Sequence, residues 1–312
     1  MFDAIFHADW SVSKSKRWLT KAERHQSGWE ISSLAIAPCQ LADLLLGEAR
    51  DSRVLAGFDF PIGVPAKWAD KVKLGSFRSF LDQLAQAPDP AFFKVAGSRQ
   101  EISPERPFYP AKAISGVKQE HLYAAHGLKA FEELRRQCEA RTKHRQAACP
   151  LFWTLGANQV GKGAISGWRE VVIPCVKEGA RLWPFDGELS AESFNGLTIA
   201  ETYPAEIYGW IDIKFQGKGG KKSQEKRSEF VPQIRVWMEK RNIRLSPDVA
   251  AQLQNGFGAA ANGEDRFDAF CGACGMIEIA NGCRAAGAPH DPDIRNFEGW
   301  ILGQKAEDIT PH

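Results

Sequence analysis

The sequence predicts an α/β protein, in which helices cover the faces of a mixed β-sheet and a large, mainly helical insertion lies in the middle of the chain. Three strand patterns follow one another near the start, and a helix, another strand and further alternating segments come after them. The apolar run at 53–63 stops abruptly at Pro61 and Gly63, as a buried central strand does. Because the strand pattern resumes only at Leu197, we expect an insertion at about 88–180.

The individual elements follow from residue spacing, since a period of two indicates a strand and a spacing of three and four indicates a helix. In the first half, we expect strands at 3–12, 17–26, 28–37 and 53–63, and helices at 40–49, 66–85 and 119–144. In the second half, we expect a strand at 197–203 and helices at 229–240, 247–254 and 264–282.

The composition is that of an ordinary globular protein. Of the 312 residues, 44% are hydrophobic and 25% are charged, which suffices for a substantial core, and we expect a single domain over 1–312. The net charge of +2 provides no global basic field, so any contact with a polyanion has to come from local patches. The first residues lack the pattern of a signal peptide, and no apolar run approaches the length of a membrane span. We therefore expect a cytoplasmic protein that does not contact membranes.

The seven cysteines are odd in number and scattered, unlike the disulfide framework of a small secreted domain. Cys271 and Cys274 form a CxxC pair, a spacing that occurs in zinc and redox sites. A zinc site needs a second pair at a matching spacing, however, and the sequence around these two thiols is typical of a helix rich in small residues. We expect both to be packing residues.

Acidic residues interrupt or follow the predicted strands. Asp9 lies within the first strand, Asp59 at the end of the run VLAGF, and Glu201 near the end of the later strand. Asp265 and Asp268 are three residues apart, so they project from one face of a helix. Carboxylates that converge at the carboxyl ends of strands are held together stably only by cations. Divalent ions fit best, so the pattern predicts a Mg²⁺ or Mn²⁺ site that activates water and stabilises the leaving oxygen of a phosphodiester.

Each of these acids also has a structural explanation. Asp9 and Asp59 are both suited to turns, and Glu201 is suited to an ion pair with an arginine. Asp265 is suited to the N-cap of its helix, with Asp268 in the first turn facing the helix dipole. Their joint placement, at or near strand ends and on a late helix, favours the functional interpretation.

Four short segments, HADWS, GFDFPIG, ETYPAE and DRFDAF, occur in an order that resembles a family of uncharacterised domains predicted to be RNase H-like nucleases. The resemblance implies a mixed five-stranded sheet with flanking helices and a metal-dependent phosphodiesterase site. It also implies that Asp9, Asp59 and Asp268 are metal ligands, with Asp265 beside them and Glu201 as a candidate second ligand. The chain departs from the family pattern at Trp10, where a small residue is common, and in its long middle segment.

Local basic and aromatic segments are candidates for contacts with nucleic acid. SKSKRW follows the first predicted strand, and KGGKKSQEKR is the densest cationic segment. An exposed tryptophan can stack on an unpaired base, which favours a contact with nucleic acid. The alternative is that the lysines belong to a solvated loop that only maintains solubility. The residues that we expect to contact nucleic acid are Lys14, Lys16, Arg17, Trp18, Arg106, Lys162, Lys221 and Lys222.

Two other functions compete with the nuclease. Gly156, Gly161 and Lys162 nearly complete the phosphate-binding loop GxxxxGK[ST] of nucleotide-binding phosphotransferases, but Gly163 stands where that loop has the hydroxyl that binds Mg²⁺. The third possibility is a non-catalytic module of the same fold that binds nucleic acid or protein. Metal-dependent degradation of nucleic acid would indicate the nuclease, ATP turnover would indicate the phosphotransferase, and neither activity would indicate the binding module.

Overall fold

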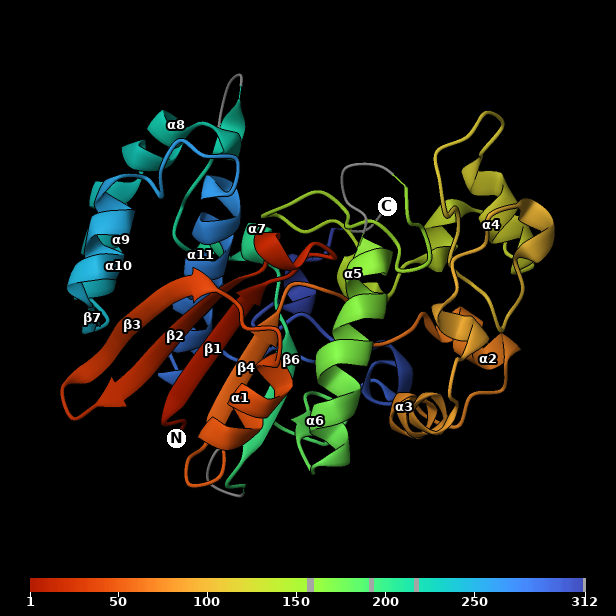
Figure 1. The fold of residues 1–312 in the computed structure, drawn as a ribbon, viewed down its shortest axis with the longest axis horizontal. Coiled ribbons are helices and arrows are strands. Elements are labelled where there is room, and N and C mark those ends of the chain that lie inside the picture. The colour runs from red at the N-terminus through yellow and green to blue at the C-terminus, as the bar shows by residue number, and fades with distance from the viewer. Residues whose placement is uncertain (156–159, 191–193, 216–218, 311–312) are drawn as a thin grey trace. The chain divides into compact units, whose positions relative to one another are not determined.

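The computed structural model describes residues 1–155, 160–190, 194–215 and 219–310. Within these residues it has an α/β fold built on a mixed sheet of seven strands, in the order β5-β6-β4-β1-β2-β3-β7 (Figure 1). The strands are β1 (Ala4–Asp9), β2 (Trp18–His25), β3 (Gly28–Ile36), β4 (Val54–Phe58), β5 (Arg181–Leu182), β6 (Leu197–Glu201) and β7 (Ile243–Leu245).

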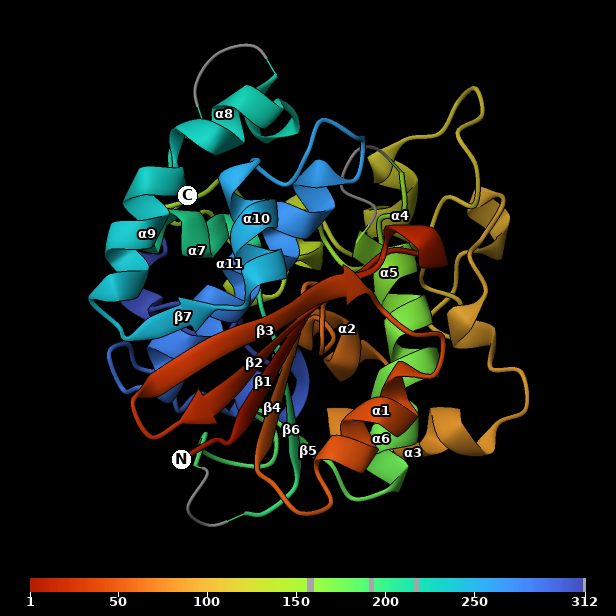
Figure 2. The same ribbon diagram turned by 60° about the vertical axis from the view of Figure 1, so that its left-hand side comes forward.

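The strand directions make the sheet mixed, as predicted. β1, β2 and β3 form an antiparallel meander, β4 and β6 run parallel to β1, and β7 runs parallel to β3 at one edge (Figure 2). The expected count of five strands is wrong for the described chain, because β5 and β7 are also present. These two strands have two and three residues, too few to display the alternation by which strands are recognised.

The described chain divides into two compact units by its internal packing. The first unit comprises 1–59 and 189–286, and the second comprises 60–188 and 287–312. The expectation of one domain with an insertion at 88–180 stays a prediction.

Helices flank the sheet in the first unit. They are α1 (Leu41–Glu48), α7 (Pro204–Trp210), α8 (Gln224–Glu229), α9 (Val231–Glu239), α10 (Pro247–Gln254) and α11 (Gly263–Ala280). α11 packs against β1 and β2, and Figure 1 shows α1 on the opposite face of the sheet. α10 begins as its sequence predicts, because the Ser246 side chain accepts a hydrogen bond from the Val249 N–H and Pro247 occupies the first turn. Cys271 and Cys274 are buried in α11, as expected for packing residues.

The second unit has an aromatic core. Trp68 packs against Phe80, Phe92 and Phe152, and Phe92 stacks on Trp168 with ring centroids 5.8 Å apart. The α-helices of this unit are α2 (Ala66–Lys71), α3 (Phe77–Gln86), α4 (Gln119–Ala125), α5 (Val160–Gly167) and α6 (Ile173–Lys177). A π-helical segment, Trp168–Val172, joins α5 to α6 just before Pro174, whose missing N–H disrupts the ordinary helical hydrogen bonding.

Two helix predictions in the second unit are wrong. The long helix expected at 119–144 ends after α4, where Gly127 has a φ of +67°, and only short 3₁₀ segments follow it. The helix expected at 66–85 is interrupted between α2 and α3, where Lys73 has a φ of +53°. None of the described helices combines the length and the apolar character needed to cross a bilayer.

Candidate active site

Asp9 and Asp59 lie side by side at the carboxyl ends of two parallel strands. β1 and β4 are neighbours in the sheet, and Ala8 is paired with Phe58, so the next residue of each strand lies at the same level. The Trp10 N–H donates a hydrogen bond of 2.7 Å to Asp59 Oδ1, which ties the two strand ends together. The two acids are therefore adjacent, because parallel neighbours in register end at the same edge of the sheet.

Glu201 lies on the other face of the sheet. It is paired with Phe58, and Phe58 is paired with Ala8, so these three side chains share one face while Asp9 projects from the opposite one. Thr202, the next residue after Glu201, is on the face of Asp9. The structure thus does not bring Glu201 together with Asp9 and Asp59, although Glu201 is buried.

A buried histidine docks α11 against the face that carries Asp9. The His7 Nδ1 atom lies 3.1 Å from the carbonyl oxygen of Ala269, to which it can only donate, so Nε2 accepts from the Thr202 hydroxyl at 2.8 Å. Burial lowers the pKa of His7 to about 3, so the ring is neutral. A Cβ atom at Gly272 would lie 2.0 Å from a carbon of the His7 ring, so only glycine permits this contact. Sequence patterns did not indicate this arrangement.

The docking of α11 brings Asp268 into the cluster, where two other elements contact it. The Tyr208 hydroxyl, on α7, donates to Asp268 Oδ1, and Lys221 Nζ donates to Oδ2. Lys221 belongs to a 3₁₀ segment, Gly220–Lys222, that is anchored by a hydrogen bond from the buried Arg227 guanidinium to the Lys221 carbonyl. Lys221 was expected to contact nucleic acid, and in the structure its ammonium group contacts Asp268 of the acid cluster.

Burial and mutual repulsion raise the pKa values of these carboxyl groups. Burial, followed by the charges of Asp59, Asp268 and Asp265, raises the pKa of Asp9 well above its usual range. Burial raises the pKa of Asp59 to about 6, and burial together with the Asp59 charge raises the pKa of Asp268. The half-buried Asp265 has its pKa raised by burial and by Glu264, whereas the charges of Lys16 and Lys221 act in the opposite direction. The four aspartates therefore form a single electrostatic cluster.

The donor set of this cluster suits a hard divalent cation. Its ligand atoms are all carboxylate oxygens, the preference of Mg²⁺ and Mn²⁺. No three of these four aspartates place one oxygen each within 4.8 Å of one another in the described chain. Lys221 is the cation that contacts Asp268, so a metal ion that binds Asp268 competes with it.

Trp10 and Trp18, on either side of the basic segment at 14–17, differ in exposure. Trp18 is buried, with the Arg266 guanidinium 4.2 Å from its ring centroid. The prediction that Trp18 stacks on a base is therefore wrong. Trp10 is half-buried beside Asp9, and the guanidinium of Arg17 lies 3.8 Å from its ring centroid. The tryptophan next to the acid cluster is therefore Trp10, which the sequence marked only as an unusual residue after Asp9.

Among the predicted lysine contacts of the first unit, Lys14, Lys16 and Lys222 are exposed, as a contact with a polyanion requires. Lys14 and Lys16 are on a 3₁₀ segment directly after β1. Lys16 is the one whose charge acts on Asp265, which places it near the cluster.

Arg106 and Lys162, which were expected to contact nucleic acid, form contacts with other residues of the second unit. Arg106 forms an ion pair of 2.5 Å with Glu101 and donates to the Val95 carbonyl at 2.9 Å. Lys162 donates to the Ala111 carbonyl at 3.3 Å. Gly156, the first glycine of the proposed phosphate loop, lies outside the described residues, and residues 151–155 before it form a turn and one isolated bridge, not the strand that a phosphate-binding loop follows.

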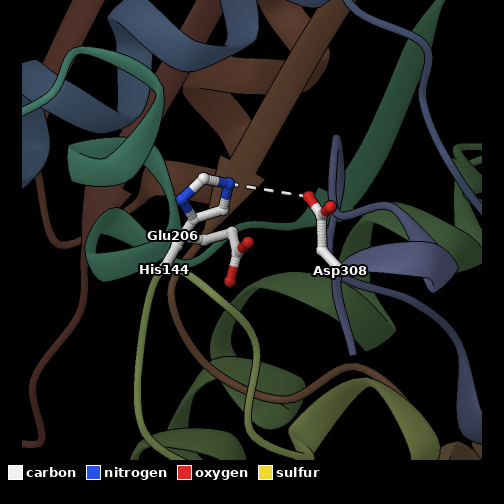
Figure 3. A group of neighbouring side chains, drawn as sticks. All are labelled: His144, Glu206 and Asp308. Carbon is white, nitrogen blue, oxygen red and sulfur yellow. Dashed lines mark ion pairs between the residues drawn. The ribbon is translucent and has the colours of Figure 1, made fainter. Parts of the chain in front are cut away.

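The second unit also contains a buried acid that the sequence did not indicate. Asp308 forms an ion pair of 2.6 Å with Lys143 and lies 3.5 Å from His144 Nε2 (Figure 3). Glu206, drawn in the same figure, belongs to the first unit. His144 and Asp308 supply two ligands, fewer than a structural metal centre uses, and Lys143 already neutralises the carboxylate.

Comparison of the chain with family models, with curated proteins and with solved structures gave no match. The four sequence motifs and the geometry of the aspartate cluster are thus the basis for a functional proposal.

Proposed function

We propose that this protein is a metal-dependent nuclease that hydrolyses phosphodiester bonds of nucleic acid at Asp9, Asp59 and Asp268. The observation that carries the proposal is the convergence of these acids, from β1, from the end of β4 and from α11, into a cluster in which their pKa values are raised. Perturbed pKa values of this kind are concentrated at functional sites. The mixed order β3-β2-β1-β4-β6 within the sheet supports the further proposal of an RNase H-like fold.

The side chains around the cluster have distinct roles in this proposal. Asp9, Asp59 and Asp268 would hold Mg²⁺ or Mn²⁺, which would polarise the phosphate and lower the pKa of water. Tyr208 orients Asp268 through its hydroxyl. Lys221, which is 40% exposed, is long enough to move from Asp268 to a phosphate oxygen of the substrate. Trp10 contributes a half-buried aromatic side chain beside Asp9, and the Arg17 guanidinium covers part of its ring.

The proposal is tested by nuclease assays of purified protein. We expect degradation of at least one member of a panel of single-stranded, duplex and branched DNA and RNA, in the presence of Mg²⁺ or Mn²⁺ and not of EDTA. Asp9→Asn should abolish the activity, with a loss of about 10³-fold or more for a metal ligand. The exposed Asp51→Asn variant, which makes the same chemical change away from the cluster, should retain it.

Circular dichroism and the melting temperature establish that Asp9→Asn is folded. If wild type and Asp9→Asn were equally inert on every substrate with both metals, the nuclease proposal would be rejected.

One observation favours a second candidate, a non-catalytic module that binds nucleic acid. Lys221 already contacts Asp268 and supplies positive charge to the cluster without a metal ion. This candidate predicts binding of nucleic acid in EDTA without turnover, and binding that Asp9→Asn does not alter. No comparable observation favours the nucleotide-binding phosphotransferase; its test is ATP turnover that is lost in Lys162→Ala.

A further inference from the structure

The second unit carries two adjoining depressions with volumes of about 380 and 570 Å³. Arg99, Lys118 and His121 line both of them, so these three side chains lie where the depressions meet. We propose that the two depressions together form one site, in which these side chains bind the phosphate group of a phosphate monoester, such as a nucleotide. The proposal concerns residues of the second unit alone and does not rest on the aspartate cluster.

The two cations at the junction are available to a ligand. Arg99 and Lys118 are both exposed, and neither forms an ion pair with a carboxylate in the described part of the chain. Glu101 is the nearest acid in sequence to Arg99, but it forms its ion pair with Arg106 at 2.5 Å and accepts a hydrogen bond of 3.0 Å from Ser98 Oγ. The positive charge at the junction is therefore not paired with a carboxylate among the described residues of this unit.

A buried hydroxyl orients the third residue of the junction. Tyr109 is 2% exposed, and its hydroxyl lies 3.1 Å from His121 Nδ1. When this hydroxyl donates to Nδ1, the neutral imidazole carries its proton on Nε2 and offers a fixed N–H donor. Two cations and a positioned N–H donor are the groups that recognise a phosphate, because phosphate has several oxygens that all accept hydrogen bonds.

The size and the apolar wall of the site indicate a ligand larger than a free inorganic anion. Pockets for small organic ligands have volumes of about 300–1,000 Å³, larger than phosphate itself requires. Ile114, which is 57% exposed, and Val117 line the smaller depression next to the cations. An apolar surface beside a phosphate-binding group suits a nucleoside 5′-phosphate. Glu120 lines the larger depression, where its charge disfavours polyphosphates.

The test is a set of binding titrations on the full chain in EDTA, by calorimetry, with adenosine 5′-monophosphate, adenosine and inorganic phosphate as probes. We expect the nucleotide to bind at least tenfold more tightly than adenosine. Equal affinities for inorganic phosphate and the nucleotide would also support the site and would assign it to the free anion. Fluorescence anisotropy with 5′-phosphorylated and 5′-hydroxyl oligonucleotides then separates a free nucleotide from a nucleic-acid end.

The variants Arg99→Gln and Lys118→Gln should each weaken binding of the nucleotide about tenfold, the effect of one lost charged hydrogen bond. Both residues are exposed, so the fold should be unaffected. Lys240→Gln, an exposed lysine of the first unit, is the matched control and should bind like wild type. Asp9→Asn should also bind normally, which separates this site from the nuclease proposal. The absence of measurable binding at millimolar probe, or unchanged binding by the Arg99→Gln, Lys118→Gln double variant, would overturn the inference.

Discussion

The raised pKa of Asp59 has an effect on protein stability that can be measured directly. Its pKa is raised from 3.8 to about 6, mainly by burial, so the folded state binds its proton more tightly than the unfolded state does. The free energy of unfolding therefore falls as the pH rises from about 4 to about 6 and is independent of this group above that range.

Asp59→Asn removes this cost, and Asn can still accept the hydrogen bond from the Trp10 N–H. In EDTA, we expect the variant to be more stable than wild type at pH 7, by at most about 3 kcal/mol, and to lose this advantage at pH 4. Urea denaturation at both pH values measures the effect. An equal difference between the two proteins at pH 4 and pH 7 would show that Asp59 is not responsible.

Lys221 competes with a metal ion for Asp268. Lys221→Gln leaves a buried carboxylate without its cation, so in EDTA we expect a loss of about 1–2 kcal/mol, since the lysine is partly exposed. Because the competing charge is gone, Mg²⁺ should raise the melting temperature more in this variant than in wild type. Thermal denaturation with and without Mg²⁺ gives both quantities.

The neighbouring Lys222→Gln serves as the control for Lys221→Gln, since Lys222 is exposed. It should behave like wild type in both conditions. A smaller response of Lys221→Gln to Mg²⁺ would contradict the competition and would assign Lys221 to metal-independent packing.

At the scale of elements, the contact between β1 and α11 determines whether Asp268 reaches Asp9. His7 fills the space that a side chain at Gly272 would need, so Gly272→Ala forces the helix away from the strand. We expect this variant to lose at least about 2 kcal/mol of stability and to bind Mg²⁺ more weakly.

The cost of Gly272→Ala should be much smaller in a His7→Ala background, where the methyl group enters the vacated space. A double-mutant cycle measured by urea denaturation tests this coupling. Gly47→Ala is the control for the glycine change, because a Cβ there meets nothing within 4 Å in α1 and should stabilise by about 0.5–1 kcal/mol. Additive effects of the His7 and Gly272 changes would mean that the helix is positioned by other contacts.

Elements differ in how far their sequence predicted them. β1, β2, β3, β4 and β6 have enough residues for the two-residue alternation or the apolar run to appear, and α10 has a serine cap and a proline in its first turn. The segment at 119–144 was expected to be one helix, yet the helix ends at Ala125. Gly127 follows with a φ of +67°, and His126 packs on Phe152, a residue distant in the chain. Local pattern cannot report a constraint that comes from distant residues.

At the scale of the whole molecule, the sequence by itself determined the α/β class, the main strands along the chain and the placement of Asp9 and Asp59 within or next to strands. These properties depend on local periodicity, which neighbouring residues alone determine.

Only the tertiary structure decided which other residues join Asp9 and Asp59. Glu201 is separated from Asp9 by the pairing register, since a shift of one residue changes the face of the sheet, and Trp18 is covered by Arg266 of α11. Asp268 and Lys221 reach the cluster through contacts between elements that lie far apart in the chain. The physical reason is that register, helix docking and charge pairing are long-range interactions, whereas a sequence pattern records the preferences of neighbouring residues.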